Sequence, residues 1–166
     1  MSLADGMLQE LEQEAQTTRR LLERVPEDRL TWRPHAKSRT LGELALHVAT
    51  VPGGVAEFVS QPSPVQAPQF VDPSPPAASE LLPALDESIA KAKKILGEMD
   101  DTALLETWRI MNGDREIFAI PRIGFVRSIM LNHWYHHRGQ LSVYLRELDV
   151  PIPSIYGPTP DENPFA

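Results

Sequence analysis

The 166-residue chain has no cysteine. Disulfide bonds, cysteine nucleophiles and thiolate metal sites are therefore excluded, and this composition fits a reducing, cytoplasmic location. No uninterrupted apolar run approaches the roughly 18 residues of a membrane span, and the N-terminal residues show no signal-peptide pattern. Positive charge is also in the minority, because 16 Lys and Arg face 23 Asp and Glu and the formal net charge is −7. This balance argues against nucleic acid or an anionic membrane surface as a partner.

Gly-rich phosphate loops and dinucleotide fingerprints are missing as well. Proline, in contrast, is abundant: of 16 prolines, six fall between Pro62 and Pro76 and five between Pro151 and Pro164. Proline lacks the backbone donor of a regular helix. We therefore predict a single domain over 1–166, with a long Pro-rich connection at 60–78 and a Pro-rich tail at 151–166.

The rest of the chain has apolar residues at helical spacing. This periodicity predicts four helices, at about 3–25, 40–58, 79–99 and 121–148. Four helices joined by one long crossover predict an all-α fold, a four-helix bundle.

Local signals refine this outline. Thr40 and Glu43 have the spacing of a capping box and should begin the second helix. The Pro-Gly-Gly run at 52–54 should kink that helix or end its first half. An Asn-Gly pair at 112–113 predicts a short hairpin or an extended loop within 106–121.

Three histidines occupy apolar positions of these helices. His133 and His137 are four residues apart and therefore neighbours on one helix face, while His47 lies on the inward stripe of another helix. Burying three imidazoles without a shared partner would cost several kcal/mol. Three neutral imidazoles leave a coordination position open, as in catalytic metal sites. We predict one divalent metal ion here; the alternative is a set of hydrogen-bonded core histidines.

Five further residues are second-shell or substrate candidates. Asn132 and Gln140 flank the histidine pair and could orient an imidazole or a bound water. His136 is a weaker ligand candidate or a proton shuttle. Glu43 could act as a general base, although capping explains it adequately. Arg138 could bind a carboxylate substrate or form an ordinary salt bridge.

The runs 41–49 and 132–141 resemble the DinB-like family, whose wider superfamily includes bacillithiol S-transferases and mycothiol-dependent maleylpyruvate isomerases. Segments 32–34 and 155–162 are also similar, so that the resemblance covers most of the chain. It implies an up-down-down-up four-helix bundle, commonly a homodimer. It also implies zinc or nickel bound by the three histidines named above. It does not fix the reaction, because many members have no known activity.

A metal-dependent enzyme is the leading functional hypothesis. Because the chain has no cysteine, the nucleophile has to come from a small molecule. A low-molecular-weight thiol would make the protein an S-transferase, and an activated water would make it a hydrolase. The alternatives are a non-catalytic stress-response or metal-binding protein, and a helical dimer without metal. Apolar residues Leu131, Trp134 and Leu145 lie on a further face of the fourth helix and suggest a second subunit.

Overall fold

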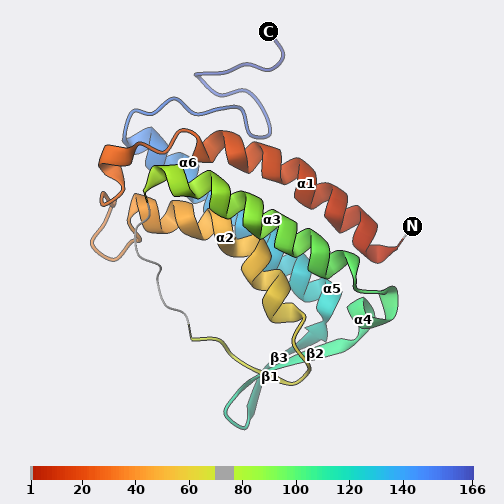
Figure 1. Cartoon of the computed structure of the whole chain (residues 1–166). Coiled ribbons are helices and arrows are strands. Elements are labelled where there is room, and N and C mark those ends of the chain that lie inside the picture. The colour runs from red at the N-terminus through yellow and green to blue at the C-terminus, as the bar shows by residue number, and fades with distance from the viewer. Residues whose placement is uncertain (1, 70–76) are drawn as a thin grey trace.

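The computed structural model describes residues 2–69 and 77–166. Long helical segments lie side by side, with a small sheet at one end (Figure 1). The long segments are α1 (Leu3–Leu22), α2 (Leu41–Val59), α3 (Leu81–Gly97) and a fourth made of α5 (Arg122–Phe125), a π-helical segment (Val126–Asn132) and α6 (His133–Glu147). The fold is thus mostly helical, and the all-α prediction is corrected by the sheet.

The sheet contains three strands in the order β1-β2-β3: β1 (Val65–Gln66), β2 (Thr107–Asn112) and β3 (Arg115–Pro121). Strand β1 pairs parallel with β2, and β2 pairs antiparallel with β3. Since Asn112 pairs with Arg115, the hairpin loop has two residues, and Gly113 takes a φ of +59° there. Glycine adopts this left-handed conformation without steric cost. The predicted hairpin is confirmed, with its loop one residue later than the Asn-Gly signal.

Short helical turns complete the described chain: α4 (Asp101–Leu105) and two 3-10 turns, Glu27–Arg29 and Ala78–Glu80. Helix α1 ends at Leu22, earlier than predicted, because Pro26 has no N–H for the Leu22 carbonyl, which instead accepts from the N–H of Val25 at 3.1 Å. Part of the predicted Pro-rich connection, residues 70–76, lies outside the described residues.

The capping box at the start of α2 is confirmed. The Glu43 carboxylate accepts from the backbone N–H of Thr40 at 2.7 Å, and the Thr40 hydroxyl accepts from that of Glu43 at 3.2 Å. These two bonds satisfy donors that a helix N-terminus otherwise leaves unpaired.

Helix α2 continues through Pro52 and bends in its second half (Figure 1). Pro52 has no N–H for the carbonyl of Val48, one turn earlier. That carbonyl instead accepts from the indole Nε1–H of Trp134 at 2.7 Å, in a buried bond. The N–H of the next residue, Gly53, donates to the Ser88 hydroxyl at 2.8 Å. The defect in α2 is therefore repaired by side chains of α6 and α3.

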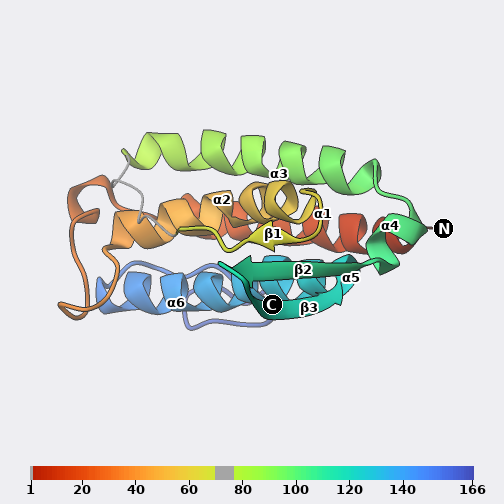
Figure 2. The same ribbon diagram turned by 90° about the horizontal axis from the view of Figure 1, so that it is seen from below.

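Helices α1 and α6 run in one direction, and α2 and α3 run in the other (Figure 2). The core lies between them and includes the fully buried side chains of Leu131, Trp134 and Leu145. Because these three residues are buried within one chain, they supply no argument for a dimer. No helix in the described ranges combines the length and the hydropathy that crossing a membrane would require.

Candidate metal centre

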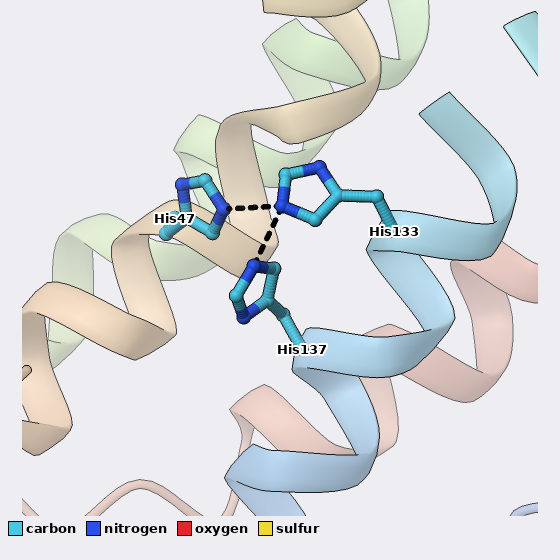
Figure 3. A group of neighbouring side chains, drawn as sticks. All are labelled: His47, His133 and His137. Carbon is cyan, nitrogen blue, oxygen red and sulfur yellow. Dashed lines mark hydrogen bonds between the residues drawn. The ribbon is translucent and has the colours of Figure 1, made fainter. Parts of the chain in front are cut away.

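Three imidazole rings converge between α2 and α6 (Figure 3). His133 Nε2 lies 3.5 Å from His47 Nε2 and 2.6 Å from His137 Nε2. One ring nitrogen from each residue lies within 4.8 Å of the other two, and all three side chains are half-buried. The three histidines could therefore hold one metal ion, although they lie 86 and 4 residues apart in sequence.

The hydrogen bond that compensates for Pro52 also holds α2 and α6 together beside this group. The bond between Trp134 and the Val48 carbonyl joins the residues that directly follow His133 and His47. The π-helical segment ends immediately before His133. Such segments are rare and occur frequently at functional sites. The sequence periodicity gave no sign of this segment.

The environment keeps two of the rings neutral. Burial lowers the pKa of His133, and electrostatic interactions with His136 and Arg39 lower it further, whereas the Ile129 carbonyl raises it. Burial likewise lowers the pKa of His137 to about 4. Both rings are thus uncharged at pH 7, which is the form that binds a metal.

Gln140 supports the ring of His137. Its side-chain oxygen lies 2.7 Å from His137 Nδ1. Because an amide oxygen accepts, it holds the ring proton on Nδ1 and leaves the Nε2 lone pair facing the other histidines.

The other candidates lie at different distances from the group. The Glu43 carboxylate is engaged in the cap of α2, one turn before His47. Asn132 is exposed at the end of the π-helical segment. His136 is also exposed, with its ring centroid 5.0 Å from that of His137. In the described part of the chain, neither Glu43 nor His136 joins the group with metal-ligand spacing.

Arg138 belongs to a different cluster. Its side chain is 1% exposed and pairs with Glu14 of α1 at 2.6 Å. It also donates to the hydroxyl groups of Thr18 and Tyr156. The carboxylate that Arg138 binds therefore belongs to the chain itself. The pair with Glu14 joins α6 to α1, and the bond to Tyr156 joins α6 to the C-terminal tail.

Sequence reasoning missed two features of the site. The first is Arg39, next to the capping box, whose charge acts on both His133 and His137. The second is a cavity of about 530 Å³ between α2, the hairpin and the fourth helical segment, with His47 and His133 among its lining residues. The hairpin side chains gave no sequence signal of this role, because alternation in a short strand indicates burial and not what the strand covers.

Comparison with known proteins gives the family of the chain. The model of the DinB family matches residues 1–163. The chain belongs to the DinB family. Its relative YrdA, an uncharacterised Bacillus subtilis protein, is 26% identical over 159 residues, which cover 95% of this chain and 90% of YrdA. The resemblance inferred from the sequence motifs is thus confirmed.

Solved DinB-like structures share the fold. A DinB-like protein from Bacillus cereus superposes with a TM-score of 0.73 at 21% identity, over 92% of this chain and 97% of that one. The DinB-like protein YjoA from Bacillus subtilis gives 0.65 at 19% identity, over 87% and 92%. At such identities the likeness concerns the fold alone.

Proposed function

We propose that this DinB-family chain is a metal-dependent enzyme, and that His47, His133 and His137 bind one divalent ion, zinc or nickel. The observation that carries the proposal is the convergence of three imidazoles at the edge of a cavity. Imidazole suits both metals. A set of three neutral ligands is typical of catalytic sites, which keep a position open for a reactant.

We propose a thiol-dependent group transfer as the reaction. When bound, the ion would lower the pKa of a thiol or water and polarise a carbonyl. Gln140 holds the proton of His137 on Nδ1, which leaves the Nε2 atom available to bind the ion. Since the chain lacks cysteine, the thiol is a low-molecular-weight co-substrate. A metal-dependent hydrolase, which needs only water, is the second candidate.

We also propose the up-down-down-up four-helix bundle, supported by the opposed directions of the α1–α6 and α2–α3 pairs (Figure 2). The homodimer stays a prediction, and light scattering of the purified chain tests it.

Metal content tests the site. We expect about one ion per chain by mass spectrometry of untagged protein, and none in the His47→Ala, His133→Ala, His137→Ala triple variant. His35→Ala is the matched control, because His35 is exposed and lies outside the group. Wild-type protein without metal after reconstitution with zinc and nickel would contradict the proposal.

The reaction class is tested on the metal-loaded protein. Thiols are incubated with electrophiles, and each mixture has a thiol-free control. Product that depends on both thiol and metal supports a transferase. Equal product without thiol supports the hydrolase instead. A loaded protein that is inactive in every mixture, but melts at much lower temperature after chelation, would indicate a structural metal.

A further inference from the structure

The cavity beside the histidine group is apolar. Its lining comes from α2, the segment after β1, the β2–β3 hairpin and the fourth helical segment. Among these described lining residues, the polar side chains are His47, His133 and Thr50, and none is an aspartate, glutamate, lysine or arginine. Away from the histidine edge, a charged group placed there would lose its hydration without gaining a partner. The lining therefore disfavours a charged occupant.

Four aromatic side chains pack against one another where the hairpin meets the helices beside the cavity. Phe58 of α2 contacts the indole of Trp108 with ring centroids 5.1 Å apart. Phe125 of α5 contacts Trp108 at 5.0 Å and Phe118 of β3 at 5.8 Å. Trp108 is fully buried and donates to the Gln61 carbonyl at 3.0 Å. The hairpin is thus anchored on both helices, and the cavity is formed before a ligand arrives.

The volume of the cavity, about 530 Å³, falls within the range of roughly 300–1,000 Å³ for small-molecule sites. Ile117 of β3 lines it while its side chain stays 48% exposed, so that this residue marks the mouth. Apolar surface facing water in a preformed pocket favours an apolar ligand.

We propose that this cavity binds the uncharged apolar body of a small-molecule substrate, with the substrate's reacting group directed toward His47 and His133. In the proposed thiol transfer, this substrate is the electrophile that receives the thiol. This inference rests on the proposed function for the direction of the reacting group, but the preference for an apolar ligand stands on the cavity alone.

The test uses N-phenyl-1-naphthylamine, an uncharged apolar fluorophore, titrated into the full-length protein as purified and after chelation. Ile117→Glu places a carboxylate at the mouth. Val143→Glu is its matched control, because Val143 is β-branched, 58% exposed and outside the cavity. We expect one probe per chain and about tenfold weaker binding in Ile117→Glu, equivalent to a loss of roughly 1.4 kcal/mol. Binding to Val143→Glu should match the wild type.

A second pair of variants fills the space without adding charge. A Cβ at Gly54, which lines the cavity, meets no atom within 4 Å, and the same holds for Gly6 in α1. Because Gly54 lines the cavity and Gly6 does not, Gly54→Leu should weaken probe binding while Gly6→Leu does not. Absence of probe binding, or equal weakening in both members of either pair, would overturn the inference.

Metal content of the same samples separates the two proposals. If the protein binds the probe but takes up no metal even after reconstitution with zinc and nickel, the apolar cavity is retained and the metal-dependent function is refuted. Bound metal without probe binding would retain the metal site and refute the apolar cavity as a binding site.

Discussion

The hydrogen bond from Trp134 to the Val48 carbonyl stabilises the fold, and its contribution can be measured separately from that of core packing. Trp134→Phe removes the indole donor, and Pro52 offers no N–H in its place. A buried carbonyl left without a partner costs about 1–3 kcal/mol. The smaller phenyl ring adds a cavity cost. We expect the free energy of unfolding to fall by about 2–4 kcal/mol in total.

Pro52→Ala separates the two costs. Alanine restores the backbone N–H that the Val48 carbonyl lacks, so that the double variant regains the bond within α2. We expect Pro52→Ala and Trp134→Phe to be non-additive, with the double variant more stable than the sum predicts by about 1 kcal/mol. Urea unfolding followed by circular dichroism gives these values without relying on tryptophan fluorescence.

Trp108 supplies the matched control. It is also fully buried and also donates its indole N–H to a backbone carbonyl, that of Gln61. The Gln61 carbonyl lies beyond the end of α2 and is not the carbonyl that Pro52 leaves without its helical donor, so Trp108→Phe and Pro52→Ala should be additive. If Trp134→Phe is additive with Pro52→Ala as well, the proline does not explain the Trp134 bond and the reasoning is refuted.

Three further predictions concern packing, the tail and the metal site. Gly53→Ala should lower the free energy of unfolding by about 1–3 kcal/mol, because its Cβ would lie 2.8 Å from the Ser88 carbonyl oxygen; stability equal to the wild type would contradict that close approach. The hydrogen bond from Arg146 holds the pKa of Asp161 below its ordinary value. Stability from this pair is therefore present above about pH 4 and lost as the pH falls further, so urea unfolding of Asp161→Asn should show a weaker acid dependence. Gln140→Ala should reduce metal affinity about 10- to 100-fold in a competition titration with a chelator. Unchanged affinity would show that Gln140 does not orient His137 for metal binding.

Local patterns predicted much of the helical fold. The capping box of Thr40 and Glu43, the Asn-Gly hairpin signal and the helical periodicity each depend on residues a few positions apart. The DinB resemblance depended on two short runs for the same reason. Helix ends were less accurate, since the exact end of α1 depends on how the chain leaves toward Pro26.

The candidate ligands were also visible in the sequence. His133 and His137 are one helical turn apart, and His47 replaces an apolar residue on a stripe, so their facing direction follows from periodicity. Arg138 shows the limit of this reasoning. It adjoins the histidine pair in sequence, but its side chain faces Glu14, and only the packing of α1 against α6 supplies that partner.

The helical class, the family resemblance and the candidate histidines could be predicted from the chain alone, because each depends on the spacing of residues within short segments. The folded chain was needed to show that the three imidazoles meet and that Trp134 and Ser88 repair the break at Pro52. It was also needed to show that the hairpin leaves an apolar cavity beside the site. These features arise where segments far apart in the chain dock on one another. Their geometry follows from the shape of the whole core, which no local pattern contains.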